Sequence, residues 1–245
     1  MPLRRSCVEC TVRGAHCFCS LNPEALRELD RMGTQVAYGV GMRVLEEGSL
    51  PERVCVVCHG TLKLTTTSQD GRTLLLRIAG AGDVLGLASV LKGSTYEATA
   101  EVMDDCEIRV IARGDFLRFM DEFQGVGQNS AESVAREYET AMLSARRLAL
   151  SASATAKLAS LLLEWGRRTA KQAAGGVSHK VGGAAGEEAL RFRMPLTHEE
   201  LGQMAGISRE TVTRVLTKLK AEGLVELEGE RMVVLSPEKM ERLYR

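Results

Sequence analysis

The segment 195-PLTHEELGQMAGISRETVTRVLTKLK-220 predicts two short helices joined by a tight turn. Thr197, followed three residues later by Glu200, forms a capping box, which marks the start of a helix. Gly206 supplies the left-handed backbone conformation that ends this helix, and Ser208 is a favoured N-cap for the next one. Two such helices joined by a glycine turn are typical of a helix-turn-helix unit.

The second of these helices has an apolar face and a polar face. Its polar residues near the N-terminus fall within an arc of roughly 140°, opposite the apolar ones. In a recognition helix this end enters the major groove, where arginine binds guanine and glutamate accepts from cytosine. Lysine further along can contact phosphate. The alternative is a solvated face on which Glu210 and Arg214 pair. The residues predicted to contact DNA are Thr197, Ser208, Arg209, Glu210, Thr213, Arg214 and Lys218.

Two parts of the chain have the pattern of β structure. Between residues 35 and 112, short apolar runs alternate with glycines, and Asp70-Gly71 between two runs is a hairpin signal. Many short strands with regular turns predict an antiparallel roll or barrel. Residues 225–235 alternate around Gly229 and predict a hairpin, or wing, after the helix-turn-helix unit.

A helical pattern begins near Ser130 and carries a heptad seam. A seam of this kind suits a partner helix, and packing within its own domain is the alternative. A further helix is expected over residues 156–168, and the glycine-rich residues 169–190 predict a flexible connection or hairpin loop. The residues predicted to form a dimer interface are Val134, Tyr138, Ala141, Ala145 and Leu148.

The composition is that of a globular protein without net charge. Among 245 residues, 32 Lys and Arg balance 32 Asp and Glu, so DNA binding requires a local patch. No apolar run approaches the ~20 residues that span a bilayer, and no signal-peptide pattern follows the start. We therefore expect no membrane contact and a cytoplasmic location, where clustered cysteines more often bind metal or do redox chemistry than form structural disulfides.

The chain has a β pattern first, then a long helix, and then a helix-turn-helix unit with a wing. In this order of elements it resembles the CRP/FNR family of bacterial transcription regulators over nearly its whole length. Residues 208–214, SRETVTR, are close to the family's recognition-helix signature, and residues 82–86, GDVLG, resemble its roll motif. The resemblance implies an α+β fold with an N-terminal antiparallel β-roll of the cyclic-nucleotide-binding type, a long dimerisation helix and a C-terminal winged helix-turn-helix. It also implies a homodimer, not an enzyme, that binds palindromic double-stranded DNA and acts on RNA polymerase recruitment. The expected domains are a cysteine-rich segment 1–20, a β-roll sensor 21–121, a dimerisation helix 122–150 and a DNA-binding domain 151–245.

The roll lacks the side chains with which related proteins bind cyclic nucleotides. Those members use a glutamate on the ribose and an Arg-Ser pair on the phosphate, and Leu87 and Tyr96-Glu97 stand at these places. Leucine cannot accept the ribose hydrogen bond, and Glu97 would repel a phosphate. We therefore expect no cyclic-nucleotide ligand, and this region looks more like the FNR branch of the family.

The N-terminal cysteines resemble the cluster ligands of the FNR branch. Its members hold a 4Fe–4S cluster on an N-terminal Cys-x-x-Cys, a third cysteine and a fourth from the roll, and Cys7-x-x-Cys10 followed by Cys17 is similar. Thiolates are soft ligands that suit iron–sulfur clusters or zinc. The spacing departs from the branch, because six residues separate Cys10 from Cys17 where five or seven are usual. The expected ligands are Cys7, Cys10, Cys17 and Cys19.

The identity of the fourth ligand has an alternative. Cys106 lies near the expected roll position, but aligning the flanking residues with the family pattern puts Arg109 closer to it. Cys55 and Cys58 also form a Cys-x-x-Cys pair, in a predicted strand. Residues three apart in a strand point to opposite faces, so we interpret both as packing residues.

The leading hypothesis is a dimeric transcription regulator that senses oxygen or redox state through an N-terminal 4Fe–4S cluster. One alternative is the same regulator with structural zinc or no metal, responding to an unknown small ligand or to thiol oxidation. Another is a thiol oxidoreductase that uses Cys7 and Cys10. This last class would need a thioredoxin-like βαβ context, which the sequence does not contain.

Overall fold

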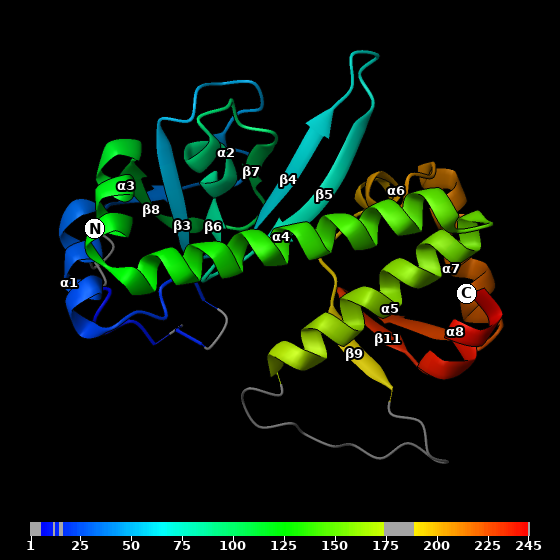
Figure 1. Ribbon diagram of the computed structural model, residues 1–245. Coiled ribbons are helices and arrows are strands. Elements are labelled where there is room, and N and C mark those ends of the chain that lie inside the picture. The colour runs from blue at the N-terminus through cyan, green and yellow to red at the C-terminus, as the bar shows by residue number, and fades with distance from the viewer. Residues whose placement is uncertain (1–5, 12, 15–16, 174–188, 245) are drawn as a thin grey trace. The chain divides into compact units, whose positions relative to one another are not determined.

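The chain folds into two compact units, Met1–Ala141 and Met142–Arg245. The computed structural model in Figure 1 describes residues 6–11, 13–14, 17–173 and 189–244. The division falls inside the long helix α4 (Gln124–Leu150), drawn in green. The expected domains treat residues 122–150 as a separate dimerisation helix, and the division into two units shares this helix between them.

The first unit contains two antiparallel four-stranded sheets, as the predicted β-roll requires. Their orders are β1-β8-β3-β6 and β2-β7-β4-β5. The predicted turn at Asp70-Gly71 joins β4 to β5, with Gly71 at φ 80°. The strands are β1 (Thr34–Tyr38), β2 (Arg43–Leu45), β3 (Arg53–His59), β4 (Leu62–Thr67), β5 (Thr73–Ala79), β6 (Val84–Leu85), β7 (Thr99–Val102) and β8 (Cys106–Ala112).

Two apolar cores hold this unit together. The first lies between the two sheets and contains Cys55 and Val57 of β3. The second lies on the other face of β3, with Val54 and Val56, and is covered by α1 (Pro23–Met32), α2 (Leu87–Lys92), α3 (Arg113–Glu122) and the start of α4. Successive residues of β3 therefore serve different cores, as the strand period of two dictates.

The second unit contains the predicted winged helix-turn-helix. Helix α5 (Ala154–Ala173) buries one apolar face, and the strands form a sheet of order β10-β11-β9. The remaining elements are β9 (Leu190–Arg193), α6 (His198–Ala205), α7 (Arg209–Ala221), β10 (Val225–Glu228), β11 (Arg231–Val234) and α8 (Pro237–Tyr244). The predicted connection over 169–190 is shorter than expected, because helix continues to Ala173 and strand begins at Leu190; residues 174–188 lie outside the described part.

Helix α4 leaves an apolar stripe exposed in the single chain. Tyr138 is 65% exposed, and Ala141 and Ala145 are also exposed. Val134 packs partly against the second core, and Leu148 lies against Gly206 of the second unit. Three of the five predicted interface residues are thus available to a partner. Within the described residues, no helix has the length and hydropathy to cross a bilayer.

Candidate functional site: a helix-turn-helix and a cysteine pocket

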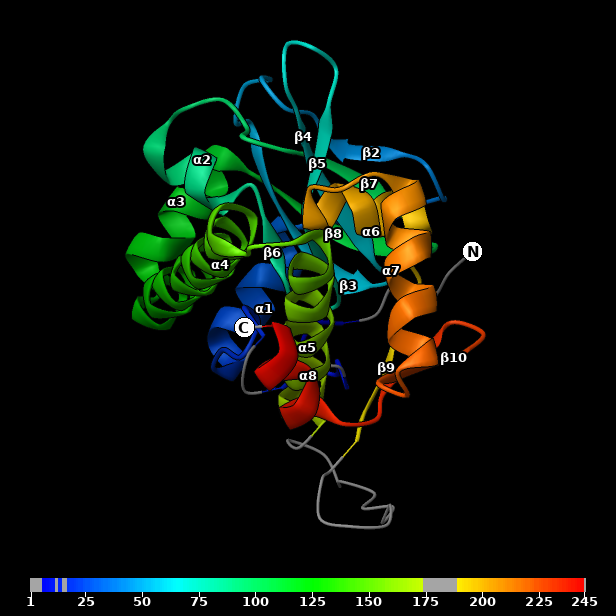
Figure 2. The same ribbon diagram turned by 90° about the vertical axis from the view of Figure 1, so that its right-hand side faces the viewer.

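The two helices of residues 195–220 form through the local signals that predicted them. The Thr197 hydroxyl accepts from the Glu200 amide at 3.2 Å, and the Glu200 carboxylate accepts from the Thr197 amide at 2.9 Å. Gly206 ends α6 at φ 63°, and the Ser208 hydroxyl accepts from the Thr211 amide to begin α7. The two helices lie side by side (Figure 2).

Helix α7 presents the predicted DNA-contacting side chains to solvent. The apolar residues of this helix are buried, whereas Arg209, Glu210, Thr213, Arg214 and Lys218 are exposed. Arg214 donates to the Thr211 hydroxyl at 3.5 Å, rather than pairing with Glu210 as the alternative supposed. Hydrogen bonds from its own backbone amide and from Ser208 lower the pKa of Glu210. A carboxylate kept ionised there is an acceptor suited to a base edge.

The wing forms next to these helices. Strands β10 and β11 pair antiparallel, with Glu228 opposite Arg231, and Gly229 takes φ 64° in the turn between them. Strand β9 pairs with the other edge of β11. The predicted hairpin over residues 225–235 is confirmed.

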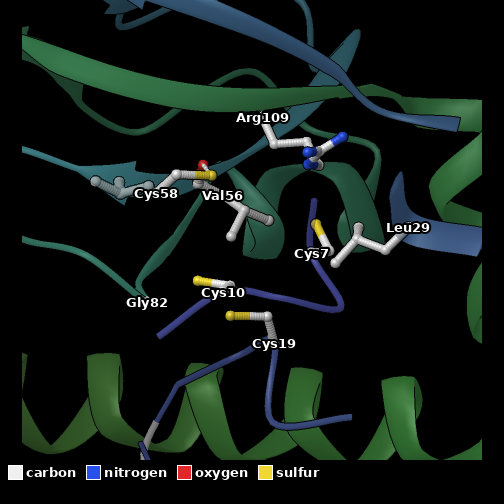
Figure 3. Close-up of a pocket in the computed structure, with 9 residues that line it drawn as sticks. Cys7, Cys10, Cys19, Leu29, Val56, Cys58, Gly82 and Arg109 are labelled. Carbon is white, nitrogen blue, oxygen red and sulfur yellow. Dashed lines mark hydrogen bonds between the residues drawn. The ribbon is translucent and has the colours of Figure 1, made fainter. Parts of the chain in front are cut away.

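A second feature is a cavity in the first unit, which we call the cysteine pocket. Its lining combines the N-terminal segment with strands β3 and β8 (Figure 3). In Figure 3, Cys10 and Cys19 lie close together, and Cys58 and Arg109 reach the same space from the sheet. The pocket is lined by Cys7, Cys10, Cys19, Leu29, Val56, Val57, Cys58, Gly82 and Arg109.

The predicted ligands occupy different places around this pocket. Cys7, Cys10 and Cys19 line it. Cys17 lies beside it against Gly82, where its sulfur accepts from the Gly14 amide at 3.3 Å. Cys106 is buried in the core between the sheets and donates to the Asp104 carbonyl at 3.1 Å. The alternative fourth ligand is therefore on the far side of the sheet from the pocket.

Cys58 is the residue whose position sequence reasoning missed. The strand alternation correctly separated it from Cys55, which is buried between the sheets. We interpreted Cys58 as a packing residue, but it reaches the cysteine pocket. A bulge in the β3–β8 pairing falls between Val57 and His59, so Cys58 has no partner in the ladder. The signal available in the sequence was that Cys58 lies two residues after Val56 and so on the same face of the strand. Val56 faces the N-terminal segment.

Arg109 is the buried cation of the pocket. Its side chain is 1% exposed, and it donates to the Gly33 carbonyl at 3.0 Å and to the Asp30 carbonyl at 3.2 Å. It also pairs with the Asp30 carboxylate at 2.8 Å. These contacts join β8 to the end of α1.

The thiols around the pocket are perturbed by burial and by each other. Burial raises the pKa of Cys7 to about 11 and raises the pKa of Cys58, and the charge of Arg109 opposes both shifts. A hydrogen bond between Cys17 and Cys19 lowers the pKa of Cys17 and raises that of Cys19. Among the described residues, no three side chains of the His, Cys, Asp and Glu types are spaced to hold one metal ion.

The segment that carries these cysteines is tied to α4. The Phe18 amide donates to the Gly82 carbonyl at 2.9 Å, and the Asn129 amide of α4 donates to the carbonyls of Phe18 and Ser20 at 2.8 and 3.1 Å. Beside Gly82, Asp83 pairs with Arg77 at 3.3 Å, and Arg77 pairs with Glu137 of α4 at 2.6 Å. Two routes thus connect the pocket's edge to the helix with the exposed stripe.

Two of the positions that bind nucleotide in related rolls, Leu87 and Tyr96, are occupied by packed side chains, whereas Glu97 is exposed and lies 3.9 Å from Lys92. Leu87 is 1% exposed within the second core. The Tyr96 hydroxyl donates to the Arg53 carbonyl at 2.7 Å and accepts from the Arg53 amide at 3.1 Å. A Cβ on Gly86 would lie 2.7 Å from the Tyr96 ring, so the turn closes directly on the tyrosine.

Comparison with known proteins gives two family matches and several full-length relatives. Residues 35–123 match the cyclic nucleotide-binding domain, and residues 156–243 match the Crp-like helix-turn-helix domain. The chain is 27% identical to the transcriptional activatory protein AadR of Rhodopseudomonas palustris, over 96% of this chain and 91% of that protein. It is 28% identical to the transcriptional activator protein FnrL of Cereibacter sphaeroides, over 94% and 88% of the two chains.

Among solved structures, FixK2 from Bradyrhizobium japonicum superposes with a TM-score of 0.70 at 23% identity. The match covers 87% of this chain and 98% of FixK2, which establishes the shared fold. The two family matches fall on the β-roll and on the winged helix-turn-helix, in the order that the fold requires. The chain therefore belongs to the CRP/FNR family and is a DNA-binding transcription regulator rather than an enzyme.

Proposed function

We propose that this regulator is a cytoplasmic homodimer that senses oxygen or redox state through a 4Fe–4S cluster in the cysteine pocket. The observation that carries the proposal is the convergence of cysteines from the N-terminal segment and from β3 on one cavity. The resemblance to the FNR branch supports the choice of cluster. By the same resemblance, the dimer would bind a palindromic site through α7 and act with RNA polymerase.

The donor set fits such a group. Thiolates are the ligands that iron–sulfur clusters take, and a cluster with four thiolates carries net negative charge, which a buried Arg109 would offset. Buried thiols such as Cys7 must release their protons on binding. Because the described side chains are not spaced around one centre, binding would draw the sulfurs closer together.

The chain's own contacts offer a way to transmit the state of the pocket. Such a cluster supplies iron and sulfide that oxygen can attack. Ordering of residues 17–20 favours the contacts of Asn129, and these bear directly on α4. The exposed stripe around Tyr138 on that helix would then meet a second copy. A shift between two such states needs only a few kcal/mol of differential stability.

The test is preparation of the protein without air. Iron and sulfide in equal amounts, a brown colour, and binding of a palindromic DNA that weakens after exposure to air are the expected results. Dimer content is followed by sedimentation in the same samples. Colourless protein that contains zinc, or that binds DNA equally with and without air, would contradict the proposal. Thiol oxidation or an unknown ligand would then be the signal.

A further inference from the structure

We propose that Cys58 of β3 is the fourth thiolate of the cysteine pocket, with Cys7, Cys10 and Cys19, and that neither Cys17 nor Cys106 is a ligand. The inference rests on the proposed function, since it assigns the ligands of the same cluster. It replaces two of our sequence-based expectations, the ligand role of Cys17 and the alternative at Cys106. Its basis is that these four cysteines line one cavity.

Strand β3 directs Cys58 towards the N-terminal segment. Val56 lies opposite Arg109 in the ladder, and both line the pocket. Cys58 follows Val56 by two residues, so its side chain leaves the same face of the sheet. The bulge at Cys58 leaves this residue outside the regular ladder, and bulges often redirect a side chain at functional sites.

Strand β8 has no thiol to offer on this face. The residue of β8 that reaches the pocket is Arg109. Cys106, three residues earlier, points into the core between the sheets, where its thiol donates a hydrogen bond to the Asp104 carbonyl. To reach the pocket, Cys106 would have to cross the sheet. The neighbouring strand β3 therefore supplies the thiol, and β8 supplies a cation.

Arg109 complements an anionic group at this position. It is buried and held by Asp30 and the Gly33 carbonyl, so its place in the wall is fixed. A cluster with four thiolates is negative overall, and a buried charge requires a nearby counter-charge. Asp30, the carboxylate that pairs with Arg109, is 29% exposed, so water solvates part of its negative charge.

Cys17 is excluded by its surroundings. Its sulfur packs against Gly82 and accepts from the Gly14 amide, and Cys17 is not among the residues that line the pocket. Its neighbour Cys19 lines the pocket and hydrogen-bonds to it. The bond now runs from the Cys19 thiol to the Cys17 sulfur, because it lowers the pKa of Cys17 and raises that of Cys19. Once Cys19 binds as a thiolate, Cys17 would donate to it, as a hydrogen-bond partner of a ligand rather than as a ligand.

The experiment compares serine variants of the full chain after anaerobic reconstitution with iron and sulfide. Bound iron, bound sulfide and the Mössbauer spectrum are measured for each. Cys58→Ser is expected to lose the 4Fe–4S signal, as are Cys7→Ser, Cys10→Ser and Cys19→Ser. Cys17→Ser and Cys106→Ser are expected to keep it. Cys55→Ser is the matched control, because it lies on the same strand but faces the core between the sheets.

A second variant, Cys58→Ala, and thermal unfolding of each metal-free protein separate loss of a ligand from loss of the fold. If Cys58→Ser and Cys58→Ala keep the full cluster, the assignment is wrong although the proposed function stands. The assignment is also wrong, with the proposed function still standing, if a folded Cys17→Ser or Cys106→Ser variant loses the cluster. If the wild-type protein takes up no cluster, both proposals fail together.

Discussion

Replacing Arg109 by methionine tests whether the buried guanidinium stabilises the first unit. Methionine keeps the length of the side chain but removes its donors. Two backbone carbonyls, those of Asp30 and Gly33, lose a charged donor, and the Asp30 carboxylate loses its partner at 2.8 Å. Hydrogen bonds to charged groups contribute about 1.5–3 kcal/mol each, so the gross loss is several kcal/mol.

Two effects reduce that loss. The Asp30 carboxylate is 29% exposed and keeps bonds from the Ser6 hydroxyl and the Cys7 amide. The buried methionine also gains transfer free energy of the order of 1–2 kcal/mol. We therefore expect the free energy of unfolding to fall by about 3 kcal/mol, and the melting temperature by roughly 6–12 °C.

The assay is urea and thermal unfolding of the reduced, metal-free protein, followed by circular dichroism. Arg118→Met is the control, because Arg118 is 74% exposed and pairs with Asp115, three residues away on the same helix. A surface pair of this kind contributes less than ~1 kcal/mol. If Arg109→Met is as stable as Arg118→Met, the desolvation cost of the guanidinium cancels its contacts, and Arg109 does not stabilise the first unit.

Two further predictions concern the DNA-binding unit. Arg214→Ala should weaken binding to the specific palindrome by about 1–3 kcal/mol and relax the preference at one base pair. Lys218→Ala should weaken binding to all DNA sequences alike and reduce the slope of the salt dependence by about one unit. Equal losses of affinity for both variants on specific and random DNA, measured by titration, would refute the assignment of α7. Gly206→Ala should lower the free energy of unfolding by more than Gly223→Ala does. Both positions have positive φ, which alone costs about 1–2 kcal/mol for alanine, but only a Cβ on Gly206 would meet another side chain, Leu148, at 2.7 Å. Equal free energies of unfolding in denaturant titrations would show that the contact with Leu148 does not affect stability.

The helix-turn-helix was predictable because its signals are local. The capping box, the glycine at Gly206 and the cap at Ser208 each act within a few residues, and all three form as expected. The short apolar runs between glycines that predicted the roll also form strands. The alternation used to separate Cys55 from Cys58 holds as well, since one face of β3 packs between the sheets and the other packs under the helices. These features depend on sequence periods of two and 3.6 residues, which tertiary context did not override.

The arrangement of the cysteines was not predictable in the same way. Spacing grouped Cys17 with Cys7 and Cys10 because they are close in sequence. The pocket is built by folding the N-terminal segment across β3, which brings Cys58 to residues about fifty positions earlier. Nothing local in either segment encodes that meeting, and the bulge at Cys58 depends on the pairing of β3 with β8. Contacts between distant segments were therefore the part that the sequence alone left open.

The amide of Asn129 makes the N-terminal segment and α4 thermodynamically interdependent. It holds the carbonyls of Phe18 and Ser20 from a helix whose exposed stripe begins two turns later. Coupling between two parts of a protein is reciprocal. If an ordered N-terminal segment stabilises one position of α4, then holding α4 in that position stabilises the ordered segment by the same free energy. A second copy docked on that stripe would thus protect the thiols at a distance. On the proposed function, the dose of oxidant that inactivates half of the molecules would rise with protein concentration.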